Sequence, residues 1–230
     1  MRTWNRLQQA GFNSWNDVIE RSHALPFSQR LREGLVRWSL QALDRLQKQD
    51  IAYFIRAFRP VDHWRILQHF WEKCTFFDIE TTSLNYLEAR ISTLACWHKG
   101  ELLQFTRGEN LDDFLDLLEE CELLVSFNGG SFDVPFVLNT WHLPELPCPH
   151  LDVRWVCYHQ GYRGGQKAIE QQLGLLRPRE LADVRGEDAV WLWERWSQYG
   201  CAESLHLLKE YCARDVLHLR EVSARMRGGG

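Results

Sequence analysis

The sequence predicts an α/β protein in which a mixed β-sheet is flanked by helices, with an N-terminal helical extension. Three observations lead to this prediction. Apolar residues recur at helical spacing up to about residue 70, strand-like runs begin at residue 75, and strands then alternate with helices. The 230 residues suffice for one sizeable core with a small appendage. We therefore expect a helical region over residues 1–72 and an α/β domain over residues 73–226.

The N-terminal region contains signals for several helices. A short first helix is expected to end at Gly11, because glycine is the common residue just past a helix. Ser14 followed by Asp17 resembles an N-cap with its acidic partner and starts a second helix. A longer helix is indicated by apolar residues at helical spacing: Leu31, Leu35, Trp38, Ala42, Leu43 and Leu46. Pro60 breaks this pattern, and a short amphipathic helix follows over residues 61–70.

The second region contains the strands. Strands are predicted at residues 75–80, 90–98, 101–106, 122–127 and 150–155. The dipeptide Lys99-Gly100 joins the second and third strands as a hairpin. Helices are predicted at residues 111–121, 132–141, 187–199 and 203–224. Residues 225–230 are expected to be a frayed end.

Composition excludes several classes of protein. Hydrophobic residues make up 45% and charged residues 25%, the balance of a globular rather than a disordered chain. No apolar run is long enough to span a bilayer and the N-terminus has no signal-peptide core, so we expect no membrane contact and a cytoplasmic location. The seven cysteines form no CxxC pair and are expected to be reduced. The spacing of Cys148, His150 and Cys157 fits no common zinc template.

Two carboxylates interrupt the first predicted strand. Side chains alternate along a strand, so Asp78 and Glu80 point to one face while Ile79 points to the other. Two like charges on one face repel each other unless a cation lies between them. The alternative is that both carboxylates are exposed to solvent at the end of an edge strand.

Two further acidic residues follow later in the chain. Asp133 comes after a predicted buried strand and the glycines at 129 and 130, which allow close approach of backbone or ligand. Alternatively, it is a charge favoured at a helix start. Asp215 and Tyr211 are four residues apart on one helix face, beside an apolar stripe. Asp215 therefore needs a partner, either a shared metal or a basic side chain such as Lys209 or Arg214. Asp152 is a further acidic residue, interpreted as structural.

Together these residues resemble the motifs of the DEDD exonucleases, the DnaQ-like branch of the ribonuclease H-like superfamily. The three motifs, D-x-E, N-x-x-x-[FY]-D and Y-x-x-x-D, occur here in order as Asp78-x-Glu80, Asn128-x-x-x-Phe132-Asp133 and Tyr211-x-x-x-Asp215. The tyrosine is typical of the Tyr-type subgroup. Segments over most of the chain, including "FFDIETTSL" and "GGQKAIEQQLG", are similar to the YprB-like predicted exonucleases. The chain departs from that pattern at Ser83, where glycine is usual, and at Cys212, where asparagine is frequent.

The resemblance implies two Mg²⁺ or Mn²⁺ ions, about 3.5–4 Å from each other, which stabilise the attacking and the leaving oxygen. Asp78 would bridge both ions, Glu80 and Asp215 would hold the ion that activates water, and Asp133 would hold the second. Tyr211 would orient the attacking water. The implied substrate contacts are Thr81, Thr82, Leu84, Asn128 and Phe132. For Leu84 and Phe132, core packing is the alternative.

Lys167 lies in the first turn of a short helix after two glycines, with Arg163 just before, and is a candidate phosphate contact. A plain glycine turn with solvated charges is the alternative. Trp191, Trp193 and Trp196 lie close together on one predicted helix and are expected to pack rather than to stack on bases.

The expected function is a 3′→5′ exonuclease that hydrolyses phosphodiester bonds at DNA or RNA ends by a two-metal-ion mechanism. An endonuclease of the ribonuclease H type and a nucleic-acid-binding module without catalysis are the alternatives. The net charge of −4 does not exclude nucleic acid as the partner, because bound metals offset a carboxylate cluster.

Overall fold

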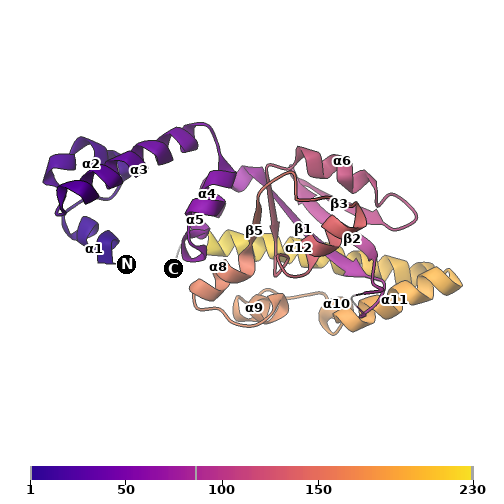
Figure 1. The fold of residues 1–230 in the computed structure, drawn as a ribbon. Helices are drawn as coiled ribbons and strands as arrows, with labels where there is room; N and C mark the ends of the chain where they lie inside the picture. Colours follow the sequence, from indigo (N-terminus) through magenta and orange to yellow (C-terminus); the bar gives the residue numbers. More distant parts are fainter. Residues whose placement is uncertain (1, 86, 229–230) are drawn as a thin grey trace. The chain divides into compact units, whose positions relative to one another are not determined.

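A computed structural model of the chain describes residues 2–85 and 87–228. The chain divides into two compact units, residues 1–53 and residues 54–230 (Figure 1). The expected domain limits, 1–72 and 73–226, stay a prediction. None of the described helices combines the length and the apolar character needed to cross a membrane.

The first unit consists of α1 (Arg2–Gln9), α2 (Trp15–Glu20), the 3-10 turn η1 (Ser22–Ala24) and α3 (Gln29–Gln47). Its early turns form as the sequence predicts. Gly11 has a φ of +76°, and Ser14 and Asp17 form a capping box in which each side chain accepts a hydrogen bond from the backbone of the other. A small core joins the elements through Leu7, Phe12, Val18, Leu25 and Phe27.

The predicted long helix is wrong in its extent. It ends at Gln47 instead of continuing to Pro60, because Gln49 adopts a left-handed φ of +54°. Asp50 then accepts a hydrogen bond from the Tyr53 backbone N–H at 2.9 Å and starts α4 (Ile51–Ala57). The elements that follow are η2 (Pro60–Asp62), α5 (Trp64–His69) and η3 (Trp71–Lys73), so the predicted helix over 61–70 is divided in two.

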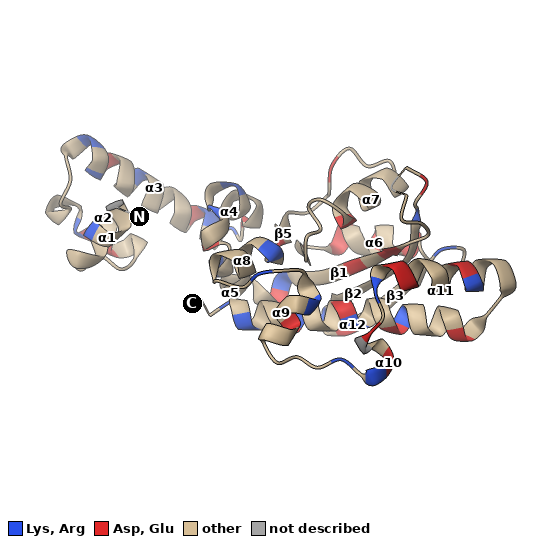
Figure 2. Cartoon of the chain, turned by 90° about the horizontal axis from the view of Figure 1, so that it is seen from below, with Lys and Arg blue, Asp and Glu red and all other residues tan. Residues whose placement is uncertain are grey.

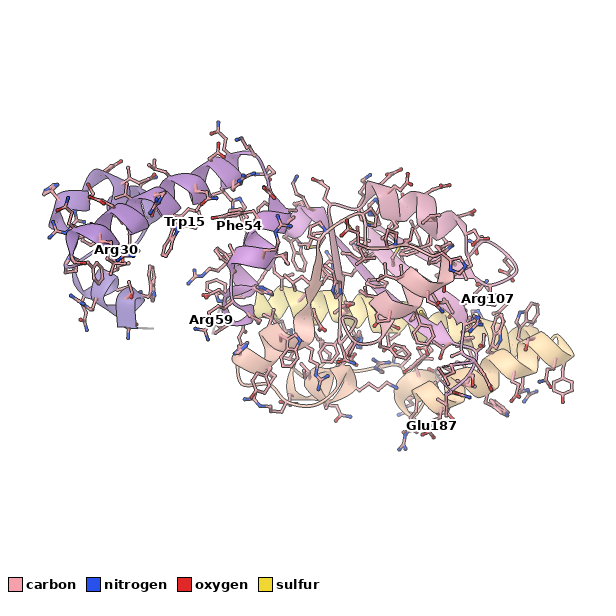
Figure 3. All side chains as sticks on the ribbon, in the orientation of Figure 1. Trp15, Arg30, Phe54, Arg59, Arg107 and Glu187 are labelled. Carbon is pink, nitrogen blue, oxygen red and sulfur yellow. The ribbon has the colours of Figure 1, made fainter. Side chains whose placement is uncertain are left out.

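The second unit is built on a mixed sheet of five strands, as predicted. The strands are β1 (Cys74–Thr81), β2 (Ile91–His98), β3 (Glu101–Thr106), β4 (Leu123–Ser126) and β5 (His150–Asp152). Their order is β3-β2-β1-β4-β5; β2 pairs antiparallel with both β1 and β3, and β4 pairs in parallel with β1 and β5. Lys99 and Gly100 both have positive φ, which confirms the hairpin turn. Arg107, which follows β3, donates from Nε to the Ile91 carbonyl at 2.5 Å (Figure 3).

Seven helices follow β3 in the described part of this unit, in addition to α5 and the end of α4 before β1. They are α6 (Asp113–Glu120), α7 (Asp133–Thr140), α8 (Val153–His159), α9 (Gln166–Gln172), α10 (Arg179–Ala182), α11 (Gly186–Tyr199) and α12 (Ala202–Met226). Residues 153–155, predicted as strand, begin α8 because Asp152 caps it by accepting from the Arg154 N–H at 3.0 Å. The predicted frayed end is wrong at Met226, which is buried in the last turn of α12.

The two faces of β1 are covered by different helices. Phe77 and Ile79 point into the main apolar core, where residues of α6 and α7 such as Phe114 and Phe136 pack. The opposite face, which carries Asp78 and Glu80, lies against α12, whose contacts include β1 and β2. Both β1 and α12 carry acidic segments where they lie side by side (Figure 2). The alternation of the strand thus separates an apolar layer from an acidic one.

Candidate active site

A cleft opens beside the second half of β1. β4 pairs with β1 only over Cys74–Phe76 and ends at Ser126, so the β4 ladder does not extend along the rest of β1 in the described chain. Clefts at the carboxyl ends of neighbouring parallel strands are common ligand sites. This cleft measures about 320 Å³ and is lined mainly by side chains from β1, α7, α12 and the loops beside them, including Asp78, Glu80, Thr81, Leu84, Asn128, Phe132, Asp133, Tyr211 and Asp215.

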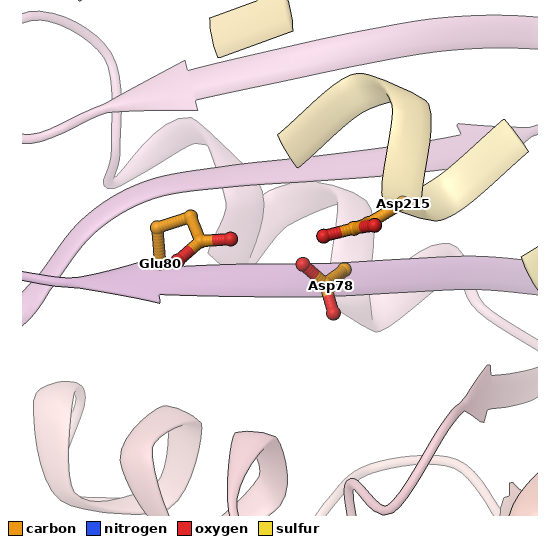
Figure 4. A group of neighbouring side chains, drawn as sticks. All are labelled: Asp78, Glu80 and Asp215. Atoms are coloured by element: carbon orange, nitrogen blue, oxygen red, sulfur yellow. The ribbon is translucent and has the colours of Figure 1, made fainter. Parts of the chain in front are cut away.

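Three carboxylates meet in this cleft. Asp78 and Glu80 come from one face of β1, and Asp215 comes from α12, which packs on that face (Figure 4). One oxygen from each of the three lies within 4.8 Å of the others. Within residues 2–85 and 87–228, they are the one such group of potential metal ligands, so no cysteine or histidine cluster accompanies them. The structure therefore brings together three of the four predicted carboxylates.

The fourth carboxylate, Asp133, borders the same cleft from the first turn of α7. Its Oδ1 accepts a hydrogen bond from the Ile79 backbone N–H at 3.2 Å. Ile79 lies on β1 past the residues that pair with β4. Gly129 is required beside Asp133, because a Cβ there would lie 1.9 Å from Ser126 Oγ and 3.2 Å from Asp133 Oδ2. The glycine thus allows the loop to pass close enough to hold Asp133 at the cleft.

The electrostatics of the cleft disfavour negative charge on the bare carboxylates. Burial raises the pKa of Asp78 well above its ordinary value, and the charges of Asp215, Asp133 and Glu80 raise it further. Burial also raises the pKa of Glu80, and the charges of Asp215 and Asp133 raise it further. Burial raises the pKa of Asp133 to about 7, against the hydrogen bond from Ile79. A bound cation would remove this repulsion.

Asp215 also has a basic partner that the sequence did not reveal. It is neither Lys209 nor Arg214 but Arg177, whose Nη2 contacts Asp215 Oδ1. Both side chains are buried, yet burial still leaves the pKa of Asp215 raised despite the opposing effect of Arg177. Asp215 therefore has a basic partner, one of its two expected partners, while the shared metal that its neighbouring carboxylates would provide for stays a prediction.

Arg177 is itself fixed by Glu170. The guanidinium makes two hydrogen bonds to this carboxylate, from Nε at 2.7 Å and from Nη2 at 2.6 Å. His218 Nδ1 lies 3.0 Å from Glu170, and Gln166 donates both to Glu170 at 3.1 Å and to the Asp215 backbone carbonyl at 2.7 Å. Although burial alone raises it, His218 and Arg177 lower the pKa of Glu170 to about 2. No local pattern in the sequence joins residues 170, 177 and 218, so sequence reasoning missed them.

Tyr211 and Lys167 lie next to this network. Burial and the charges of Asp215, Glu80 and Asp78 raise the pKa of Tyr211 above its ordinary value, so the phenol stays protonated. Lys167 Nζ lies 4.6 Å from the Tyr211 ring centroid and donates to the Val184 carbonyl. Lys167 is not among the residues that line the cleft, so its predicted phosphate contact stays a prediction.

The other predicted substrate contacts have different positions. Thr81, Leu84, Asn128 and Phe132 line the cleft, whereas Thr82 is hydrogen-bonded to Arg90 outside it. Leu84 is 69% exposed, so core packing does not explain it. Phe132 is partly exposed and meets the Phe136 ring edge-on at 5.0 Å.

The loop at Asn128 is organised by Asp152. Asp152 Oδ1 accepts from the Asn128 N–H at 2.8 Å and also caps α8, and Asp152 Oδ2 accepts from the Gly130 N–H at 3.4 Å. This confirms the structural interpretation of Asp152. The carboxylate also helps to hold Asn128 in its left-handed conformation, with a φ of +64°.

The donor set of the cleft fits a hard divalent cation. Carboxylate oxygens are the ligands that Mg²⁺ and Mn²⁺ prefer, and the three clustered residues offer neither sulfur nor imidazole. Burial keeps their pKa values raised even though Arg177 lies beside Asp215, so a bound cation would stabilise the charged carboxylates. Asp78, Glu80 and Asp215 would hold the ion, with Asp133 close by.

Comparison with known proteins agrees with the fold. A family model described as the RNase_H superfamily matches residues 75–227. Among solved structures, the chain is similar to the family B DNA polymerase from the hyperthermophilic archaeon Pyrobaculum calidifontis, with 15% sequence identity and a TM-score of 0.50. The match covers 64% of this chain and 24% of the polymerase chain, so this chain spans about a quarter of that polymerase's length, and the likeness shows the fold alone. No curated protein matches the chain.

Proposed function

The chain belongs to the RNase_H superfamily, and from this premise we propose that it is a metal-dependent 3′→5′ exonuclease of the DEDD type, close to the YprB-like proteins. One observation carries the proposal. Asp78, Glu80 and Asp215 converge within 4.8 Å in a cleft that Asp133 and Tyr211 also line. All three motifs of the resemblance thus meet at one place, although they lie up to 137 positions apart (215 − 78).

The proposed roles follow from the positions of the side chains. Asp78, Glu80 and Asp215 hold two Mg²⁺ or Mn²⁺ ions together with Asp133. When bound, these ions supply positive charge for an attacking water and for the departing oxygen. Asp215 is kept in place by Arg177, and Asp133 by the Ile79 N–H. These contacts preorganise the carboxylate oxygens that would hold the ions.

Tyr211 is proposed to position water rather than to remove its proton. Its raised pKa keeps the hydroxyl protonated near neutral pH, so the group donates and accepts hydrogen bonds. Leu84, which is exposed at the cleft, and Phe132 are proposed to contact the terminal base, and Asn128 the sugar. Thr81, the last residue of β1, is proposed as a further substrate contact.

Digestion of 5′-labelled DNA and RNA oligonucleotides tests the proposal. With Mg²⁺ or Mn²⁺ we expect a descending ladder of products. Asp78→Asn should reduce the rate of digestion by more than about 100-fold, because mutating a residue that only supports a metal ligand already costs up to about 100-fold in activity. Asp116→Asn, the same change at an exposed site on α6, is the matched control and should leave the ladder unchanged. A single internal cut would favour an endonuclease, and binding without cleavage would favour a binding module.

A further inference from the structure

We propose that the exposed face of α8 and the turn after it bind single-stranded nucleic acid next to the cleft. This surface, called the α8 face below, consists of Arg154, Trp155, Tyr158, His159 and Arg163, all of which are exposed. The inference deepens the proposed function by naming the substrate form, and it rests on that function for the link to the cleft.

α8 is amphipathic, and its apolar side is already used. Val153, Val156 and Cys157 are buried, so they hold the helix on the body of the unit. The aromatic rings on the opposite side are not needed for that packing, since Trp155 and Tyr158 are each 47% exposed. Two large aromatic side chains on one solvent-facing side of a short helix offer π-faces to a ligand.

The rings and the guanidinium groups of the α8 face form one continuous series. The Trp155 and Tyr158 rings meet edge-on, with centroids 6.0 Å apart. The Arg154 guanidinium lies 5.7 Å from the Trp155 ring, and that of Arg163 lies 4.0 Å from the Tyr158 ring. Arg163 also donates to the Tyr158 and Tyr162 carbonyls through Nη1, which fixes its position. Two adjoining aromatic rings are therefore flanked by a guanidinium group at each end of a prearranged surface.

The charge of the segment from Val153 to Ile169 favours binding of a polyanion. From Val153 to Ile169 the chain contains Arg154, Arg163 and Lys167 but no aspartate or glutamate, whereas the whole chain carries a net charge of −4. Basic groups interleaved with aromatic rings are the features with which proteins hold single strands, because phosphates meet the cations while bases stack on the rings. A duplex keeps its bases stacked inside and has none to offer to Trp155 or Tyr158.

The α8 face is joined to the cleft through Asn128. Arg154 Nη1 donates to Asn128 Oδ1, and Asn128 lines the cleft. Asp152 accepts from both the Asn128 and the Arg154 backbone N–H groups, so the same carboxylate positions both residues. A strand whose end lies in the cleft can therefore continue past Asn128 onto α8.

Binding of fluorescein-labelled oligonucleotides, followed by anisotropy, tests the inference. The full chain with Asp78→Asn is the reference, because cleavage is then suppressed. Trp155→Ala and Tyr158→Ala should each weaken binding of single-stranded DNA or RNA about 5- to 150-fold, the usual effect of removing one stacking ring. Trp191→Ala is the matched control, because Trp191 is 52% exposed and has Arg195 4.9 Å from its ring, but lies on α11. The affinity of the Trp191→Ala variant for the oligonucleotides should equal that of the reference.

Two further measurements distinguish a loss of base stacking from misfolding of the variant and from a loss of phosphate contacts. Trp155→Phe keeps a ring and should restore most of the affinity lost in Trp155→Ala. Arg154→Gln and Arg163→Gln should each lower the salt dependence of binding by about 0.7 in log–log slope, the value for one phosphate contact on a single strand. Separate DNA and RNA arms show which of the two is bound.

Some results would overturn the inference. They are unchanged affinity in the Trp155→Ala/Tyr158→Ala double variant, tighter binding of a blunt duplex than of the single strand, or no binding of either single strand. A wild-type chain that binds through the α8 face but cleaves nothing would instead defeat only the proposed function, so the two failures are distinguishable.

Discussion

Two groups of buried or partly buried acids lie side by side in this protein and are compensated in opposite ways. Glu170 accepts two hydrogen bonds from Arg177 and lies 3.0 Å from His218, and its pKa falls to about 2. Asp78 and Glu80 have carboxylates as their nearest charged neighbours, and their pKa values rise. Asp215 joins the two groups, because it contacts Arg177 and also belongs to the carboxylate cluster.

The difference shows how to separate a structural charge from a functional one. A buried charge that is paired depends on its partner, and removing that partner alone is costly. A buried charge without partners destabilises the fold and is explained by something that binds there. We infer that Glu170 and Arg177 stabilise the scaffold, whereas Asp78 and Glu80 are retained for a cation.

The largest effect is expected on the compensated side. Arg177→Met should lower the free energy of unfolding by about 3–5 kcal/mol, because it leaves Glu170 buried without its main partner. Urea denaturation at pH 7 measures this loss. The double variant Glu170→Met/Arg177→Met should lose less than Arg177→Met alone, since no uncompensated glutamate remains. An equal or greater loss in the double variant would contradict this interpretation of the pair.

A smaller effect on the free energy of unfolding is expected at Asp133, where the charged side chain destabilises the fold instead of stabilising it. Its pKa in the folded state is raised to about 7 from an ordinary value of 3.8, so the folded protein binds more protons between these values. Stability should therefore fall as the pH rises through this window, by on the order of 2–3 kcal/mol between pH 5 and pH 8 without metal. Asp133→Asn removes the contribution of Asp133, while Asp78, Glu80 and Asp215, whose pKa values are also raised, still contribute in the same sense.

The measurement is the difference between the chain and Asp133→Asn in melting experiments from pH 5 to pH 8. His150, whose pKa burial lowers to about 4, titrates in the opposite sense, but it is present in both proteins and cancels in the difference. Saturating Mn²⁺ should abolish the contribution of Asp133, because the ion favours its charged form. Parallel pH profiles of the two metal-free proteins would refute the assignment.

The smallest effect is expected at a surface pair in the same domain. Lys209 Nζ lies 2.8 Å from Glu109, and both side chains are partly exposed. Lys209→Met should change the free energy of unfolding by no more than about 1 kcal/mol, because solvent screens such a pair. The same urea titration measures it, and a loss comparable with that of Arg177→Met would show that burial does not govern these ion pairs.

Local patterns predicted much of the fold. The capping box at Ser14 and Asp17, the Lys99-Gly100 hairpin and the five strands follow from turn chemistry and from side-chain alternation over a few residues. The errors occur where a local signal was overridden. Asp152 turns an apparent strand into a helix start by capping it. The long N-terminal helix ends at Gln47, before the left-handed Gln49 and the cap that Asp50 provides for α4.

The candidate site was predicted in part. The resemblance to three motifs selected the four carboxylates and Tyr211, of which Asp78, Glu80 and Asp215 meet in space, and strand alternation placed Asp78 and Glu80 on one face. Trp191 was expected to pack, yet it is about half exposed, because helical spacing does not say which face of a helix meets the core. Glu170, Arg177 and His218 had no signal in the sequence.

The sequence by itself determined the alternation of β1 and the helical spacing of Tyr211 and Asp215, because these depend on neighbours within a few residues. Only the tertiary structure decided that Asp215 would meet Arg177 as well as Asp78, and that Arg154 would reach Asn128. Such partners lie 26 to 137 positions apart in the chain, differences obtained from their residue numbers. Electrostatic compensation depends on distance in space and on burial, and neither is set by local sequence.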